Sequence, residues 1–459
     1  MTHWRGERAV SVILHNEFTS ALKKILPIFL SLAGSGFLAF LTQVLLGHTL
    51  TVDEFGILST GLSIAVILTA VIGFGMPSVW LLIFGQEGWH AFRWVHKSFS
   101  MLGGWGVIVL VMSWVGLAFV VKDERLMNTM WWLQTMVILQ VMVELLSAKL
   151  QLEARYLTLS FWQTFPHIGR LAVATIVYLT ATSTAESVAK GFGAVSAVLI
   201  MFALYALSSM TPAKMHLSGH PDNNSQGTQS SGPAPDLVGL LRLAWPYAGT
   251  AVLVMLYGRI EIVLLGNMTS PSAAATFSVA TAFLLVAFLV PQAIYQRFLL
   301  PKIHRWFFSD WQRFLAVYRF GCAAMGLLGV VGTLAMYLFG ETLVSVVFGE
   351  KYREAGDVLS WLSVCVLIRF LSSSIESALM SGDFRKQRLY CQALSALISV
   401  PCAYLLINLY GIKGAVINKV LTELTLLVFF SYVSSRYVME GATWAGWTLR
   451  LRQSEPCGR

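Results

Sequence analysis

Residues 57–85 read ILSTGLSIAVILTAVIGFGMPSVWLLIFG, a run that contains no charged side chain. A helix of about 20 apolar residues crosses the hydrocarbon core of a bilayer, so this run predicts a membrane-spanning helix. The whole chain has the same character, because 56% of its 459 residues are hydrophobic and only 12% are charged. An average soluble domain carries about 25% charged residues. The composition therefore predicts an integral membrane protein and excludes a cytosolic enzyme.

Eleven further apolar stretches lie on either side of this run. They are too long and continuous for the strands of a membrane barrel, so we expect an all-α integral membrane fold with twelve transmembrane helices. The predicted spans are 25–47, 57–85, 99–121, 127–148, 157–180, 190–210, 243–266, 273–296, 320–340, 358–380, 389–410 and 412–438.

One polar segment interrupts the apolar pattern after the sixth span. Residues 211–242 are rich in Gly, Ser and Pro, which predicts a flexible cytoplasmic linker. The linker divides the chain into two sets of six helices. The predicted regions are a cytoplasmic N-terminal segment at 1–24, a first six-helix bundle at 25–210, the linker, a second six-helix bundle at 243–438 and a cytoplasmic tail at 439–459.

The two halves of the chain share short sequence matches in the same order. Leu45-Leu46-Gly47 in the first half recurs as Leu264-Leu265-Gly266 in the second. Gly193-Ala194-Val195 likewise recurs as Gly414-Ala415-Val416. Internal repeats of this kind build transporters whose substrate site lies between the repeats. We therefore expect two pseudo-symmetric bundles around a central cavity.

The distribution of Lys and Arg predicts the orientation in the membrane. With the N-terminus placed in the cytoplasm, 22 of the 32 Lys and Arg residues fall in cytoplasmic segments. Cytoplasmic segments of membrane proteins carry such an excess, so both termini are expected to be cytoplasmic. The net charge of +9 then reflects membrane orientation, and no nucleic-acid partner is expected.

Four ordered motifs resemble those of a known transporter family. They are Asp53-Glu54-Phe55-Gly56-Ile57-Leu58, then Arg259-Ile260-Glu261-Ile262-Val263-Leu264-Leu265-Gly266, then Phe348-Gly349-Glu350-Lys351-Tyr352-Arg353-Glu354-Ala355, and last Tyr410-Gly411-Ile412-Lys413-Gly414-Ala415. In this order the set resembles the Wzx-type polysaccharide flippases of the multidrug/oligosaccharidyl-lipid/polysaccharide (MOP) exporter superfamily.

The resemblance implies both a fold and a function. The fold is two six-helix bundles around a central cavity. The function is to move an isoprenoid-pyrophosphate-linked oligosaccharide from the cytoplasmic to the outer leaflet of a bacterial inner membrane, by alternating access, for O-antigen, capsule or exopolysaccharide synthesis. The family also implies a polysaccharide polymerase and a chain-length regulator as partners.

Ionisable residues inside the spans mark candidate sites, because each one is costly to place in a bilayer. Arg170, Arg259 and Arg369 lie furthest from both membrane interfaces. A guanidinium group stays charged and offers a planar fork of donors that matches pyrophosphate oxygens. We therefore expect these three side chains to bind the substrate headgroup in the cavity. The alternative is that each one neutralises a nearby Glu and fixes helix packing.

Three further intramembrane residues are candidates for ion coupling. Glu261 and Glu423 could couple transport to a proton or to sodium, because a carboxylate removed from water can exchange a proton near neutral pH. Lys419 lies four residues before Glu423 on the last predicted helix, where the two side chains can form an ion pair.

The loop between the eighth and ninth spans combines basic and aromatic residues. Its Arg297, Lys302 and Arg305 are placed to attract anionic membrane lipids or the approaching substrate at the cytoplasmic face. The alternative is that they only enforce the orientation of the chain.

Chemical motifs of enzymes are absent from the sequence. It has no Walker A motif, no nucleophile elbow and no metal-ligand spacing, so we expect no catalytic residue, no metal and no cofactor. Rival hypotheses are a multidrug cation antiporter or a peptidoglycan-precursor flippase of the same superfamily. From another class, a membrane glycosyltransferase or polymerase is disfavoured by the short predicted outer loops.

Overall fold

The computed structural model describes residues 34–120, 123–180, 184–217, 236–292, 294–295, 311–379, 384–439, 443–444 and 446–447. Within these residues the protein is built of helices, and none of them belongs to a strand. The all-α fold predicted from composition is confirmed. The predicted N-terminal segment 1–24 and the loop residues Arg297, Lys302 and Arg305 lie outside the described residues.

The first half of the chain contributes one helix or helix pair for each of its six predicted spans. A helix covers residues 34–49 and is called helix 34–49 below. It is followed by α2 (Val52–Gly73), α3 (Met76–Glu87), the short 3-10 helix η1 (Gly88–Ala91), α4 (Phe92–Val120), α5 (Glu124–Leu152), α6 (Tyr156–Thr180) and α7 (Ala185–Ser208).

The second half repeats this count, with one bent pair. Its elements are α8 (Leu237–Met268), α9 (Pro271–Gln292), α11 (Trp311–Phe348), η4 (Glu350–Tyr352), α12 (Arg353–Leu362), α13 (Val364–Leu379), α14 (Arg385–Tyr410) and α15 (Ile412–Tyr437). The pair made by η4–α12 and α13 is bent by 45°. When α2 with α3 and α12 with α13 each count as one, the elements follow the twelve predicted spans in order.

Length and composition support a membrane location for these helices. In the described part of the chain, eight helical stretches are long and apolar enough to cross a membrane. The bent pair of α12 and α13 makes a ninth if it is one span. One of the eight stretches, Val52–Phe119, contains α2, α3 and α4 in succession.

Short polar side chains cap the N-termini of several helices. Thr51 Oγ1 accepts a hydrogen bond from the backbone N–H of Glu54 at the start of α2. Asp236 Oδ1 does the same for Gly239 at the start of α8. Such caps satisfy backbone donors that a helix leaves free in its first turn. Asp236 caps the helix and apolar residues follow it directly, so α8 includes residues 237–242 of the predicted linker 211–242.

The long apolar run 57–85 is divided between two helices. Phe74 and Gly75 adopt positive φ angles of 47° and 65°, which end α2 and begin α3. A Cβ atom on Gly75 would lie 2.6 Å from the Cβ of Tyr247 on α8. Glycine therefore serves both the left-handed turn and the close approach of α8.

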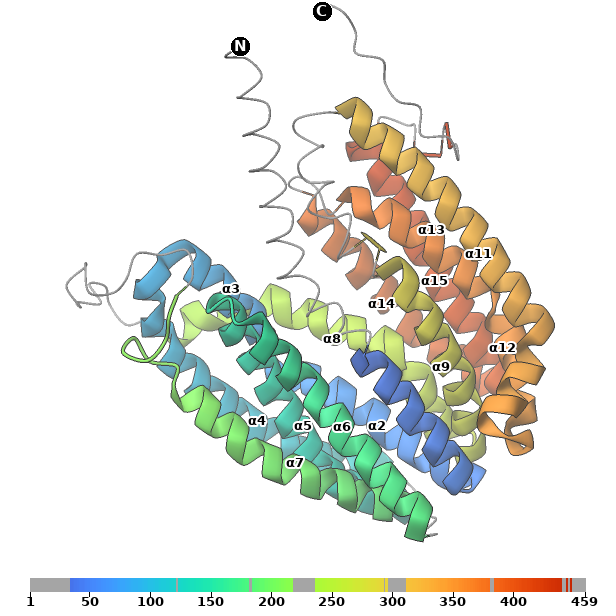
Figure 1. Cartoon of the computed structure of the whole chain (residues 1–459), viewed down its shortest axis with the longest axis horizontal. Helices are drawn as coiled ribbons and strands as arrows, with labels where there is room; N and C mark the ends of the chain where they lie inside the picture. Colours follow the sequence, from blue (N-terminus) through green and yellow to red (C-terminus); the bar gives the residue numbers. More distant parts are fainter. Residues whose placement is uncertain are drawn as a thin grey trace, which may run out of the picture.

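The helices form two groups that diverge toward one end of the molecule (Figure 1). We call this end the linker end, because α7 ends and α8 begins there. The opposite end, where helix 34–49 finishes and α2 starts, is called the far end. α8 crosses between the groups, so that its first half contacts α3 and α4 while its second half packs against α14 and α9.

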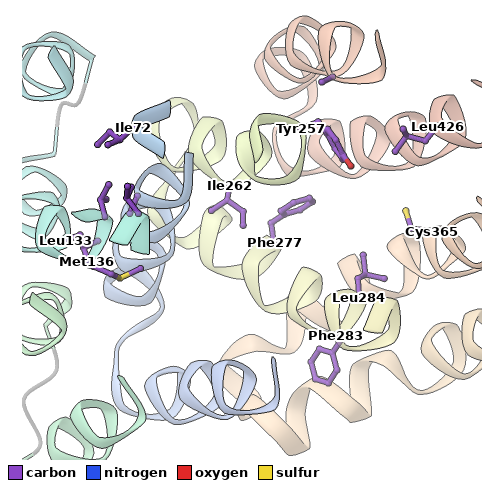
Figure 2. Close-up of a cluster of buried hydrophobic side chains, with 14 of the residues drawn as sticks. Ile72, Leu133, Met136, Tyr257, Ile262, Phe277, Phe283, Leu284, Cys365 and Leu426 are labelled. Carbon is purple, nitrogen blue, oxygen red and sulfur yellow. The ribbon is translucent and has the colours of Figure 1, made fainter. Parts of the chain in front are cut away.

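At the far end the two halves of the chain are in tight contact. A Cβ on Gly56 of α2 would lie 1.8 Å from the carbonyl oxygen of Pro271, the first residue of α9. Lys351 Nζ donates hydrogen bonds to the carbonyl oxygens of His48 at 3.1 Å and Leu50 at 2.7 Å. Ile262 of α8 and Phe277 of α9 are buried and lie beside each other in the hydrophobic core (Figure 2). The structure is therefore closed at the far end.

A charged cavity between the bundles

A cavity of about 450 Å³ lies between the two halves of the chain. Helix 34–49, α8, α9, α13 and α14 contribute its walls. Most of the lining is apolar or aromatic, including Phe40, Tyr257 and Phe288. The charged residues that line it are Arg259, Arg369, Glu376 and Arg388. Their formal charges leave an excess of two positive charges in a largely apolar space.

Arg259 lies in the second half of α8 and lines this cavity. Within the described residues, no carboxylate oxygen lies within 4 Å of its guanidinium group. The nearby Glu261 attracts it from a greater distance. A positive charge with no direct partner in an apolar cavity is costly, and a bound anion would offset that cost.

Arg369 of α13 connects the cavity with the interior of the second half. Its Nε lies 3.5 Å from Oε2 of Glu423 on α15, whose side chain is fully buried. Its guanidinium carbon also lies 5.1 Å from the centre of the Phe288 ring, a cation–π arrangement. About a quarter of the Arg369 side chain stays exposed, on the cavity side.

Sequence analysis did not identify a third arginine of the cavity. Arg388, near the start of α14, donates from Nε to Glu376 Oε1 at 2.6 Å, and Gln392 contacts the same oxygen at 3.4 Å. The signal available in the sequence was the i, i+4 spacing of Arg388 and Gln392. Arg388 was predicted to lie at the cytoplasmic interface, where basic residues are expected in any case, so this spacing was not interpreted as part of a site.

Arg170 lies elsewhere. It belongs to α6 in the first half and is not among the residues that line the cavity. Its Nη2 is buried and has no hydrogen-bond partner among the described residues. The structure thus brings Arg259 and Arg369 together around one cavity and keeps Arg170 apart from it.

The three residues considered for ion coupling form one buried cluster behind Arg369. Glu261, Lys419 and Glu423 are 1%, 8% and 0% exposed. Glu423 forms its ion pair with Arg369 of α13. Within the described residues, no carboxylate oxygen lies within 4 Å of Lys419 Nζ, so the local pair predicted from the i, i+4 spacing is replaced by a long-range one.

Comparison with known proteins places the fold. No family model matches the sequence. A curated protein of Shigella dysenteriae that is named for O-antigen transport is 22% identical over 196 residues. These residues are 41% of this chain and 47% of that protein, so the match spans about half the length of the relative.

Solved structures of two transporters cover most of the chain. The lipid II flippase MurJ, in an inward closed conformation, has a TM-score of 0.68 and 10% identity, with 90% of this chain and 89% of MurJ covered. An inward-facing multidrug resistance MATE family transporter of the MOP superfamily also has a TM-score of 0.68, with 12% identity and coverage of 90% and 96%.

The architecture of the described residues is therefore the one found in MurJ and in this MATE transporter. In particular, the chain has the same fold as the solved MATE transporter of the MOP superfamily. The resemblance drawn from the four sequence motifs is confirmed at this level.

Proposed function

We propose that this protein is a flippase of the bacterial inner membrane. Its substrate is an isoprenoid-pyrophosphate-linked oligosaccharide, which it moves from the cytoplasmic to the outer leaflet for cell-surface polysaccharide synthesis. Both termini are cytoplasmic in this proposal, so the linker end faces the cytoplasm. The closed far end and the diverging bundles then correspond to a state that receives substrate from the cytoplasm.

The observation that carries this proposal is the excess positive charge of the cavity. Arg259 has no direct counter-ion among the described residues, and Arg369 shares its charge between Glu423 and the cavity. Two guanidinium groups that line one cavity from different helices suit a pyrophosphate, which presents several acceptor oxygens to planar donor forks. The apolar remainder of the cavity would strengthen these contacts by excluding water.

Two further features support a lipid-linked sugar over a free anion. The Shigella dysenteriae relative is named for O-antigen transport, and the MurJ fold belongs to a protein named as a lipid II flippase. Cavities of roughly 300–1,000 Å³ hold small molecules, so about 450 Å³ fits a headgroup with its first sugars while the isoprenoid stays in the bilayer.

The second candidate function is export of cationic drugs. The fold likeness to a multidrug MATE transporter and the aromatic residues Phe40, Tyr257 and Phe288 of the cavity favour it. A cationic drug would, however, meet a net positive cavity in which Glu376 is the only carboxylate among the described lining residues, and that one is paired with Arg388. Charge therefore favours the anionic substrate.

We further propose that the buried cluster of Glu261, Lys419 and Glu423 couples transport to a cation. Arg369 links this cluster to the cavity, because the same side chain contacts Glu423 and faces the substrate. A pyrophosphate that attracts Arg369 would weaken its pair with Glu423. Substrate and cation occupancy would thereby affect one another through one residue.

The test compares matched arginine variants in a strain that lacks the gene. Arg259→Ala removes the cavity charge, Arg259→Lys keeps the charge but not the donor fork, and Arg436→Ala removes an exposed arginine at the end of α15. Loss of charge-assisted hydrogen bonds worth about 1.5–3 kcal/mol predicts roughly 10- to 150-fold weaker binding of an isoprenyl pyrophosphate by Arg259→Ala. Arg436→Ala should behave as wild type.

Surface polysaccharide should fall in parallel with binding, with Arg259→Lys in between. Equal binding and polysaccharide in Arg259→Ala and Arg436→Ala, at equal protein levels, would reject the anionic cavity as the substrate site. Polysaccharide unaffected by deletion of the gene, combined with increased sensitivity to cationic drugs, would favour the second candidate function.

A further inference from the structure

A buried polar cluster lies between α8, α13, α14 and α15. Its acidic members are Glu261 and Glu423, and its amide is Asn418, all at most 1% exposed. Asn418 Nδ2 donates to Glu261 Oε1 at 3.0 Å and to Ser399 Oγ at 3.2 Å. Ser399 and Thr422 are hydrogen-bonded to each other at 2.7 Å. The cluster is thus a connected network inside the second half.

Several oxygen atoms of this network remain without a hydrogen-bond donor. Both carboxylate oxygens of Glu423 and Oδ1 of Asn418 are buried and have no hydrogen-bond partner among the described residues. Carboxylate and amide oxygens are the ligands that hard cations prefer. By the type of its oxygen ligands alone, the cluster could hold a sodium ion.

The charges of the cluster argue against sodium. Two carboxylates, Glu261 and Glu423, face two cations, Arg369 and Lys419. Arg369 contacts Glu423 directly. Lys419 lies close enough to Glu261 to attract it electrostatically. The thiol of Cys365 lies close enough to all four charged groups to interact with each of them electrostatically. Figure 2 shows Cys365, Tyr257 and Leu426 on three different helices of this region.

A sodium ion would disturb this balance. The four side chains sum to zero, so a further cation would leave one uncompensated positive charge among these buried groups. Uncompensated buried charge is strongly unfavourable. Lys419 has no carboxylate oxygen of the described residues within 4 Å, so it balances the cluster through its field and not through one salt bridge.

We infer that the ammonium group of Lys419 takes the place of an alkali cation in this cluster, so that the cluster does not bind sodium. The inference narrows the proposed coupling role of the cluster, because it rules out sodium as the coupled ion at this site. It is independent of the identity of the transported substrate.

Thermal unfolding of the purified protein tests the inference without any transport assay. Wild type is compared in sodium chloride and in choline chloride at equal ionic strength. The variants are Lys419→Met, which removes the charge and keeps the side-chain length, and the double variant Glu261→Gln/Lys419→Met, which restores charge balance. Sodium-22 binding to each protein provides a second readout.

Wild type should unfold at the same temperature in both salts and should bind no sodium-22. Lys419→Met leaves one negative charge in excess, so its unfolding midpoint should be lower in choline and should rise by several degrees, with saturation, as sodium is added. The double variant should again be indifferent to sodium.

Saturable stabilisation of wild type by sodium would overturn the inference. So would a Lys419→Met protein that is indifferent to sodium. If Lys419→Met does not fold, the decision rests on sodium binding by wild type and on whether the double variant folds again. A double variant that still does not fold would assign Lys419 a packing role instead. Because every readout is on purified protein, failure of the proposed substrate would not affect these outcomes.

Discussion

Gly56 offers the sharpest test of how the far end closes. It lies in the first turns of α2, and the Cβ atom of an alanine at this position would stand 1.8 Å from the carbonyl oxygen of Pro271 and 2.4 Å from its carbonyl carbon. Ordinary contacts of this kind are about 3.5 Å, so α2 and α9 must separate by roughly 1.5 Å. The obstacle is backbone, which cannot rotate away as a side chain could.

The clash penalises the closed state, and it shifts the equilibrium if opening of the far end separates α2 from α9. Overpacking a tight contact costs about 1–3 kcal/mol, and that energy shifts a two-state equilibrium by about 5- to 150-fold. Gly56→Ala should therefore increase the population of the state with an open far end by this factor. Alanine also favours helix over glycine by about 1 kcal/mol, so unfolding of α2 is not the expected response.

Accessibility of one engineered cysteine measures the shift. Thr60 of α2 is 1% exposed and faces Gly266 of α8. With the five native cysteines replaced, Thr60→Cys should react slowly with a water-soluble maleimide in nanodiscs, and Gly56→Ala should accelerate the reaction by the predicted 5- to 150-fold. The matched control is Gly104→Ala on α4, where a Cβ meets no atom within 4 Å.

An unchanged labelling rate in a folded Gly56→Ala protein would refute this reasoning, because it would mean that the contact of α2 with α9 relaxes without opening the far end. Equal acceleration by Gly104→Ala would also refute it, because the effect would then not come from the contact of α2 with α9.

Three further predictions concern charges. Lys351→Ala removes the cation from the end of helix 34–49, which costs about 0.5–1 kcal/mol and should open the far end about 2- to 5-fold in the same cysteine assay. Arg369→Ala leaves the buried Glu423 carboxylate unpaired, so it should lower the free energy of unfolding by about 3–5 kcal/mol in thermal or denaturant unfolding. The double variant Arg369→Ala/Glu423→Gln should recover stability but not transport. An Arg369→Ala protein as stable as wild type would contradict the pairing. Arg388→Ala should weaken binding of farnesyl pyrophosphate by about tenfold, and Glu376→Gln should strengthen it by about tenfold. One charge roughly 10 Å from the bound pyrophosphate is worth about 1–2 kcal/mol at an effective dielectric constant of 20. If both variants shift the affinity in the same direction, the electric field of the cavity does not control binding.

Most of the helix order could be predicted from the sequence, because apolar length alone determines which segments can span a bilayer. The break at Phe74 and Gly75 could not. The run 57–85 is apolar on both sides of it, and the close approach of Tyr247 to Gly75 comes from another part of the chain. α11 also extends well beyond the predicted span 320–340, from Trp311 to Phe348.

The candidate site was predictable in part. The depth of a charge along a span follows from sequence, but the direction in which it faces does not. Arg259 and Arg369 face one cavity, whereas Arg170 has a similar depth and lies apart from it. The i, i+4 spacing of Lys419 and Glu423 identified neighbours on one helix, yet the ion pair of Glu423 is with Arg369 on α13. Such a partner depends on tertiary packing, which local spacing does not contain.

The most direct measurement of the proposed function is the leaflet in which lipid-linked repeat units accumulate. In spheroplasts of a strain that lacks the gene, a membrane-impermeant glycosidase would report whether the isoprenoid-linked oligosaccharide is on the outer leaflet. Single repeat units protected from the enzyme, exposed again by wild-type protein but not by Arg259→Ala, are the expected result. Repeat units that are equally accessible with and without the gene, in a strain with no second flippase, would contradict the account.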